Sequence, residues 1–327
     1  MSGFYHAVTQ VSHRTCLVAL LLIPLILLPS GYQFANLPKF LILQVSAVLV
    51  SAGVLLGALS RDDAPDLPLP ILFFLVVSIL QFGRSLNPDE ASLLLLTLTG
   101  SVAVGFGVSK ERLESLATAV AIGGGLVALV GVLEAFGVAA AQLPSAGRPS
   151  ATLGFRNVAA NYAAGCLPFG FYLLTRRDSY KRIAGATVTF LVALFILYTR
   201  SRGAWVGVSV SAALFILWFV RHGKHKVVSL PRLRSILVAS GAALFLLYLG
   251  SLDLRFEDRS PSRLDEKKHS LAATVRLLAT PDSDRDRFRI WSHTVEMAAD
   301  HPLAGVGLGN WSAIYPAYDL GDVLHLH

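Results

Sequence analysis

Apolar runs long enough to cross a lipid bilayer recur along most of this chain of 327 residues. A membrane-spanning helix needs roughly 20 consecutive and mostly apolar residues, and the sequence holds about nine such runs. They cover 15–30, 40–59, 67–83, 91–108, 114–136, 157–174, 183–199, 204–220 and 235–251. Because only helices and closed barrels satisfy their backbone in lipid, the pattern predicts an all-α polytopic membrane protein with a bundle of about nine transmembrane helices.

Composition supports the same class. Hydrophobic residues make up 54% of the chain and charged residues 15%, whereas a soluble domain carries about 25% charged residues. The first apolar run follows Arg14 and also resembles the core of a signal peptide, but further runs come after it and we favour a span. Cys16 and Cys166 lie far apart in two apolar runs, which indicates free buried thiols.

The basic residues predict the orientation of the bundle. With the N-terminus in the cytoplasm, the inner loops hold Arg14, Arg61, Lys110, Arg112, Arg176, Arg177, Lys181, Arg182, Arg221, Lys224, Lys226, Arg232 and Arg234. The short outer loops hold Lys39, Arg84, Arg148, Arg156, Arg200 and Arg202. This excess on the inner side follows the positive-inside rule. The net charge of +7 is therefore explained by membrane topology, and we expect no nucleic-acid partner.

The chain divides into three parts. Residues 1–150 hold the N-terminal transmembrane helices, 151–251 hold the core transmembrane helices, and 252–327 form a large outer loop with short helices. In this loop a helix is expected from about Ser283, with His301 and Pro302 as its end. Gly305, Gly307 and Gly309 then permit a tight turn or a close approach. A chain end at His327 is unusual for a membrane enzyme, so we expect the loop to be truncated here.

Arginine stands at the expected outer membrane surface, where the charge rule should deplete it. The positions are Arg156 before one run, Arg200 and Arg202 between two runs, and Arg285, Arg287 and Arg289 in the large loop. A guanidinium group is always charged, and its fork of donors matches phosphate oxygens, so a cluster would suit a phosphate or diphosphate headgroup. The alternative is that these side chains reach lipid headgroups or pair with nearby carboxylates such as Asp284, Asp286 and Glu296.

Other polar residues allow further readings. His325 and His327 could share one face of a strand and bind a metal, but no other ligand follows at suitable spacing, and we expect no metal or cofactor. A histidine can instead act as a general base. Glu134 is a candidate intramembrane carboxylate, and the glycines at 123–125 indicate close helix packing.

Three ordered motifs resemble the O-antigen ligase and polymerase superfamily, which shares the Wzy C-terminal domain. Thr199-Arg-Ser-Arg-Gly-Ala204 is similar to its Ser-Arg-Gly-Ala segment at the start of a span. Arg287-x-x-x-Trp291 followed by Pro302-Leu-Ala-Gly-Val-Gly307 resembles its Arg-x-x-x-Trp and Pro-Leu-x-Gly-x-Gly segments. His325-Leu-His327 resembles the beginning of its His-x-His-Asn motif, and Gly154-Phe-Arg-Asn-Val-Ala-Ala160 also resembles a common segment.

The resemblance implies a membrane glycosyltransferase in the bacterial inner membrane, with the large loop in the periplasm. It would transfer a glycan from undecaprenyl diphosphate to an acceptor hydroxyl, either on lipid A-core, on another glycan or on a protein, without a metal. Arg202 and Arg287 would hold the donor diphosphate, and Arg200, Arg289 and Arg156 would contribute to its binding. His327 would activate the acceptor hydroxyl or orient it, and His325 would be the second catalytic residue.

The motifs do not separate an O-antigen ligase from a polysaccharide polymerase or a protein O-oligosaccharyltransferase. A solute or anion transporter is the alternative from another class. It would predict an inverted repeat and charged groups near the bilayer midplane, and the sequence shows neither. A purely structural fragment is the third reading, because the Asn expected after His327 and the final spans are missing.

Overall fold

The computed structural model describes residues 2–27, 36–61, 69–106, 113–136, 138, 149–201, 203–210, 285–302 and 304–319. All regular structure in these ranges is helical, and no strand occurs within them. The all-α class is therefore confirmed for this part of the chain. The chain forms two compact units, and each is described by itself. Unit 1 comprises Met1–Cys16, Leu43–Val108 and Arg276–His327, and unit 2 comprises Leu17–Ile42 and Ser109–Val275.

The helices follow the apolar runs closely. They are α1 (Ser2–Leu22), α2 (Leu37–Arg61), α3 (Leu69–Phe82), α4 (Pro88–Phe106), α5 (Leu113–Ala135), α6 (Arg156–Leu174), α7 (Ser179–Thr199), α11 (Arg285–Asp300) and α12 (Trp311–Ile314). Two single 3-10 turns, η2 (Ala151–Leu153) and η4 (Tyr315–Ala317), complete the set. Residues 203–210 are also helical, as expected for the run at 204–220, whereas the run at 235–251 lies outside the described residues.

The first helix differs from its predicted range of 15–30. Helix α1 begins at Ser2 and ends at Leu22, two residues before Pro24. Proline lacks the amide hydrogen of a helix interior, and it disfavours helical geometry at the residue before it. The apolar character of the run continues past Pro24, but the helix does not.

The predicted number of spans is not confirmed. Among the described helices, Glu114–Ala135 and Ser179–Thr199 are long and apolar enough to cross a bilayer. Pro38–Ala52 and Leu69–Phe82 are shorter apolar helices. These helices fit a membrane bundle, while the count of nine stays a prediction.

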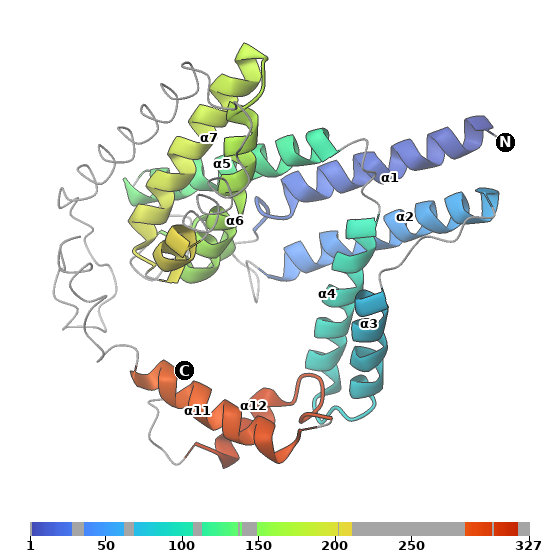
Figure 1. Ribbon diagram of the computed structural model, residues 1–327, viewed down its shortest axis with the longest axis vertical. Helices are drawn as coiled ribbons and strands as arrows, with labels where there is room; N and C mark the ends of the chain where they lie inside the picture. The colour runs from blue at the N-terminus through green and yellow to red at the C-terminus, as the bar shows by residue number, and fades with distance from the viewer. Residues whose placement is uncertain are drawn as a thin grey trace, which may run out of the picture. The chain divides into compact units, whose positions relative to one another are not determined.

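Unit 2 is built around three helices. Helices α5, α6 and α7 lie side by side and make the most extensive contacts between elements, with α6 against α7 the largest (Figure 1). Their shared core is apolar and consists largely of Ala121, Val127, Ala128, Val132, Ala159, Ala160, Ala163, Leu173, Val188, Val192 and Phe195. Since most of the α5 and α6 contributions are small, the backbones approach closely, as is common where helices pack in lipid.

The glycines at 123–125 serve this packing, as the sequence predicted. A Cβ atom at Gly124 would lie 2.5 Å from the Cβ atom of Cys166, and one at Gly125 would lie 2.9 Å from a methyl carbon of Val188. Both distances are shorter than two carbon atoms tolerate. The glycine run therefore lets α6 and α7 approach α5. Cys16 and Cys166 are both buried, in agreement with their apolar surroundings.

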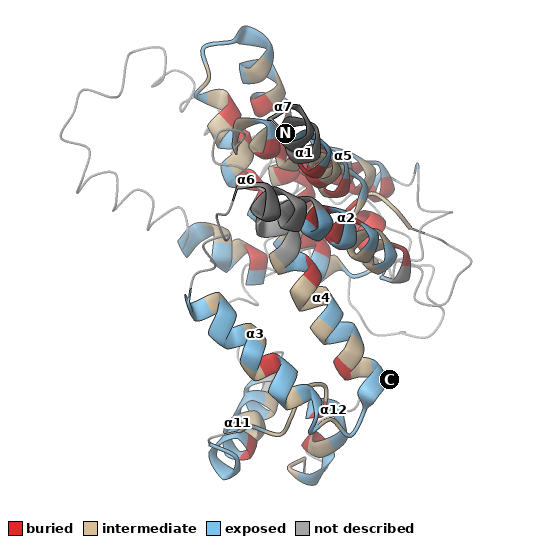
Figure 2. Ribbon diagram, turned by 90° about the vertical axis from the view of Figure 1, so that its right-hand side faces the viewer, coloured by how far each residue is buried: buried red, intermediate tan, exposed pale blue. Residues whose placement is uncertain are grey.

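Unit 1 contains the α3–α4 hairpin and the short helices of the C-terminal part. Helices α3 and α4 lie side by side, and α11 and α12 lie at the end where the two are joined (Figure 1). Helix α3 is exposed along most of its length (Figure 2), and its exposed side chains are apolar, with Leu69 76% and Phe73 69% accessible. An apolar helix surface of this kind suits a lipid environment.

Candidate functional site

One end of unit 2 brings together two of the predicted arginines. Helix α6 begins at Arg156, and the antiparallel α7 ends at Thr199, so both termini stand at the same end of the pair. The Oγ atom of Ser201 donates a hydrogen bond to Oδ1 of Asn157 at 3.2 Å. Arg156 precedes Asn157 and Arg200 precedes Ser201, so each arginine adjoins one partner of this bond. We call the residues Arg156, Asn157, Arg200 and Ser201 the arginine end.

The turn that carries Arg200 has an unusual backbone. Arg200 has φ 49° and ψ 32°, the left-handed conformation that costs a non-glycine residue about 1–2 kcal/mol. Its amide donates to the carbonyl of Leu197 at 3.1 Å, which closes the last turn of α7. The hydroxyl of Thr199 donates to the carbonyl of Ile196 at 2.7 Å, and the indole Nε1 of Trp205 donates to the same carbonyl at 3.2 Å. These bonds offset the strain and fix the direction of the chain at Arg200.

The buried carboxylate of Glu134 holds the segment that leads into α6. Glu134 is 2% exposed, and its Oε2 atom accepts hydrogen bonds from the backbone amides of Ser150 at 3.0 Å and Ala151 at 2.8 Å. Ala151 has φ 49°, a left-handed conformation that these bonds help to maintain. The candidate intramembrane carboxylate of the sequence is thus a structural support of residues 150 and 151.

Lys39 supports the same segment and was not singled out from the sequence. Its Nζ atom donates to the carbonyl of Ile26 at 2.8 Å and to that of Thr152 at 2.6 Å. The hydroxyl of Thr152 donates to the carbonyl of Pro24. Burial lowers the pKa of Lys39 to about 8. A single lysine at the head of an apolar run was the available signal, but its partners, 13 and 113 residues away, could not be inferred.

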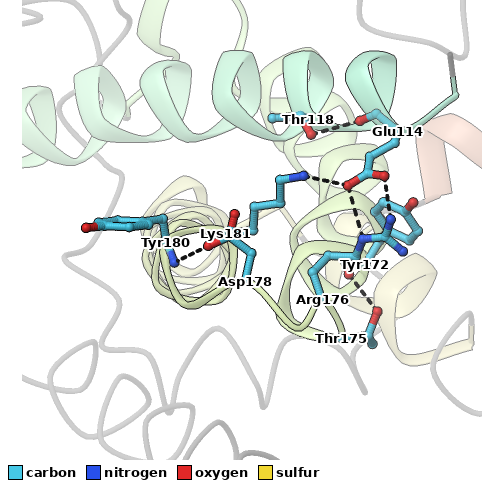
Figure 3. A network of polar contacts seen from close by, with 8 residues as sticks. All are labelled: Glu114, Thr118, Tyr172, Thr175, Arg176, Asp178, Tyr180 and Lys181. Atoms are coloured by element: carbon cyan, nitrogen blue, oxygen red, sulfur yellow. Dashed lines mark hydrogen bonds and ion pairs between the residues drawn. The ribbon is translucent and has the colours of Figure 1, made fainter.

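The opposite end of unit 2 has a different charge arrangement. There Glu114 accepts hydrogen bonds from the guanidinium of Arg176 and, at 2.7 Å, from Nζ of Lys181 (Figure 3). The guanidinium carbon of Arg176 lies 4.9 Å from the ring centroid of Tyr172. Two of the four basic residues of this predicted inner loop, Arg176 and Lys181, therefore share one carboxylate of α5, which offsets part of their charge.

Helix α11 carries the predicted Arg287 and Arg289 in unit 1. Its bounds confirm the helix expected from about Ser283 to the stop at His301 and Pro302. Positions 287 and 291 are one turn apart and share a side of the helix, whereas position 289 lies roughly 160° away from 287. Trp291 is 60% exposed, and its ring packs edge-on against Phe288 with centroids 5.4 Å apart. The two arginine positions thus do not share one face of α11.

Three of the predicted site residues lie outside the described residues. These are Arg202, His325 and His327. The residues on either side of Arg202 are described, and Ser201 belongs to the arginine end. The roles proposed for all seven site residues therefore stay predictions, with Arg156 and Arg200 brought to one end of one unit.

The sequence was compared with protein families, curated proteins and solved structures. Residues 186–325 match the family model Wzy_C, described as O-antigen ligase. No curated protein and no solved structure gives a significant match. The matched range begins within α7 and includes the Ser-Arg-Gly-Ala segment, α11 and the glycine turn. It supports a membrane glycosyltransferase of ligase or polymerase type. Over residues 186–325 the chain is thus similar to the O-antigen ligase family, the family that its motifs predicted.

Proposed function

We propose that the protein is a glycosyltransferase of the O-antigen ligase type in the bacterial inner membrane. It would transfer a glycan from undecaprenyl diphosphate to an acceptor hydroxyl, with lipid A-core as the favoured acceptor, at the periplasmic face. The match of residues 186–325 to the O-antigen ligase family carries this proposal. The N-terminus would lie in the cytoplasm and residues 252–327 in the periplasm, in keeping with the distribution of basic residues.

The proposed reaction needs a base for the acceptor and positive charge for the leaving group. The acceptor oxygen attacks the anomeric carbon of the donor glycan, and the bond from that carbon to the diphosphate oxygen breaks. His327 takes the proton from the acceptor hydroxyl, with His325 beside it in sequence. Arg202 and Arg287 hold the diphosphate and neutralise the charge that develops on it as it leaves.

Arg200 and Arg156 have supporting roles in this proposal. The bond between Ser201 and Asn157 ties together the two segments that carry them. Arg289 is a weaker candidate than Arg287 for binding the diphosphate, because its position lies on another side of α11. We therefore assign Arg287 to the diphosphate and Arg289 to the surrounding surface.

The test is transfer of glycan from a lipid-diphosphate donor by membranes that hold the protein. We expect Arg202→Ala, Arg287→Ala and His327→Ala each to lower the rate at least about 100-fold, as is common when charge stabilisation or a general base is lost. Arg176→Ala is the matched control, since it removes an arginine from the opposite end of unit 2. Full transfer by all three variants would show that the site assignment is wrong.

The acceptor decides between the related activities. Product on lipid A-core indicates a ligase, a lengthened lipid-linked glycan indicates a polymerase, and a glycosylated protein indicates an oligosaccharyltransferase. Solute uptake into liposomes without any lipid-diphosphate-dependent transfer would favour the transporter reading instead.

A further inference from the structure

A buried asparagine joins the glycine turn of the C-terminal part to the α3–α4 turn. Asn310 is 1% exposed. Its Oδ1 atom accepts a hydrogen bond from the amide of Leu86 at 2.7 Å, and its Nδ2 atom donates to the carbonyl of Arg84 at 3.0 Å. Nδ2 also donates to the carbonyl of Val306 at 2.8 Å. One side chain thus uses its acceptor and its donors to hold two loops of unit 1 together.

The surrounding glycines are required by this contact. Gly307 has φ 98°, and a Cβ atom there would lie 2.6 Å from Nδ2 of Asn310. Gly309 has φ 76°, and a Cβ atom there would lie 2.9 Å from the backbone nitrogen of Ala91, the fourth residue of α4. Only glycine combines these conformations with such a close approach. The glycine turn predicted from the sequence is therefore a docking surface for the start of α4.

Two further side-chain bonds flank the asparagine. The Nε2 atom of Gln81, near the end of α3, donates to the carbonyl of Ala304. The hydroxyl of Ser312 donates to Oε2 of Glu90 in the first turn of α4 at 3.2 Å. The contact thus extends over both sides of the α3–α4 turn. We call residues 304–312, docked on residues 81–91, the clasp.

The clasp is connected to α11 through aromatic residues. Trp311 stacks on Tyr315 with ring centroids 4.5 Å apart, and its Nε1 atom donates to the hydroxyl of Thr294 in α11 at 3.4 Å. Tyr315 is buried, and its hydroxyl lies 3.4 Å from Nδ1 of His293. The hydroxyl of Tyr318 donates to Oδ2 of Asp300 at 2.9 Å, at the last residue of α11. The direction of α11 therefore follows from how residues 304–318 are docked.

We propose that Asn310 is a positioning residue: through the clasp it orients α11, and with it position 287, on the end of the α3–α4 hairpin. The effect on transfer rests on the proposed function, because the role of Arg287 is taken from it. The amide at 310 must donate and accept, whereas an ionised aspartate of the same shape only accepts. Asn310→Asp would set a carboxylate against the carbonyl oxygens of Arg84 and Val306.

The docking of residues 304–312 on residues 81–91 can be measured by cross-linking, without an assay of glycan transfer. Glu90→Cys and Ser312→Cys, whose native side chains are hydrogen-bonded, are combined and treated in membranes with a short bifunctional thiol reagent. We expect Asn310→Asp to slow cross-linking at least about fivefold, the equivalent of one lost hydrogen bond. Asn87→Asp is the matched control. Asn87 is an exposed asparagine of the same turn, and its Oδ1 atom accepts from the amide of Glu90 at 3.3 Å, which aspartate can also do.

Rescue distinguishes positioning from a general folding defect. In the cysteine pair, Asn310→Asp should raise the donor KM and lower transfer, and the cross-link should restore transfer to within about twofold of the cross-linked parent. The proposal is wrong if the Asn310→Asp variant cross-links as fast as the parent cysteine pair. It is also wrong if the cross-link forms in this variant but does not restore transfer. If the protein with its native Glu90 and Ser312 shows no transfer, the proposed function fails, and the cross-linking rates alone decide whether the clasp exists.

Discussion

The hydroxyl of Ser201 donates a hydrogen bond to Oδ1 of Asn157, a residue 44 positions earlier, at 3.2 Å. It joins the first turn of α6 to the residue that follows the left-handed turn after α7. Arg156 and Arg200 are the residues just before its two partners, and Arg202 comes directly after one of them. The bond thus ties together the segments that carry Arg156 and Arg200, two of the arginines proposed to bind the donor.

The first prediction concerns this bond. Ser201→Ala and Asn157→Ala should each raise the KM for the lipid-diphosphate donor about two- to tenfold, the effect of losing a hydrogen bond of about 0.5–1.5 kcal/mol. If both act through the bond between them, the double variant should resemble either single one. Steady-state kinetics in membranes measures this. Effects that simply multiply in the double variant would mean that the bond does not position the arginines.

The second prediction separates the charge of Arg200 from its backbone role. Arg200→Gly keeps the left-handed turn, because glycine adopts φ near 49° without strain. It should nevertheless lower transfer about 10- to 100-fold, as expected for a charged hydrogen bond of about 1.5–3 kcal/mol. Arg200→Lys should restore only part of this, since lysine lacks the fork of donors.

Arg176→Ala is the control for that loss. Arg176 belongs to the partly exposed cluster with Glu114 and Lys181, where solvent weakens ion pairs, so transfer should change less than about fivefold. If the Arg200→Gly variant is as active as Arg176→Ala, Arg200 is not part of the site.

The positions of many helices could be predicted, because they depend on the local sequence. The run at 114–136 became α5 almost residue for residue, and α11 ends at the residue before His301 and Pro302, as expected. The end of α1 at Leu22 could not be predicted from hydropathy alone. The apolar run continues to residue 30, whereas the helix ends two residues before Pro24, because proline disfavours helical geometry in the residue before it.

The supports of the candidate site could not be predicted, because they depend on pairs far apart in the chain. Asn310 and Leu86 are 224 residues apart, and Lys39 and Thr152 are 113 residues apart. Asparagine and lysine in such places have many possible partners, and only the fold selects one. The arginine end could be predicted in part, since the sequence indicated that Arg156 and Arg200 lie on the same side of the membrane.

The third prediction concerns the pH dependence of stability at Lys39. Burial lowers its pKa in the folded protein from 10.5 to about 8, so between these values the unfolded chain binds more protons than the folded one. The contribution of Lys39 to stability should therefore rise as the pH increases from about 8 to about 10. Lys39→Met lacks this titration and also leaves the carbonyls of Ile26 and Thr152 without the lysine.

The measurement is the apparent Tm of the protein in detergent at several pH values. The Tm difference between the parent and Lys39→Met should widen in favour of the parent above pH 8. The variant also corrects for other groups that titrate in both proteins. A difference that stays constant or narrows would contradict the burial of the ammonium group.

The last prediction tests the close packing of α5 on α7. A Cβ atom at Gly131 would overlap the ring of Phe195, which is fully buried. Gly131→Ala should therefore destabilise the protein by about 1–3 kcal/mol through overpacking, even though alanine favours a helix. Gly165→Ala in α6 is the matched control, because a Cβ atom there meets nothing within 4 Å. It should be neutral or stabilise by up to about 1 kcal/mol. Thermal unfolding in detergent compares the two, and equal Tm values would mean that α5 and α7 do not pack at Phe195.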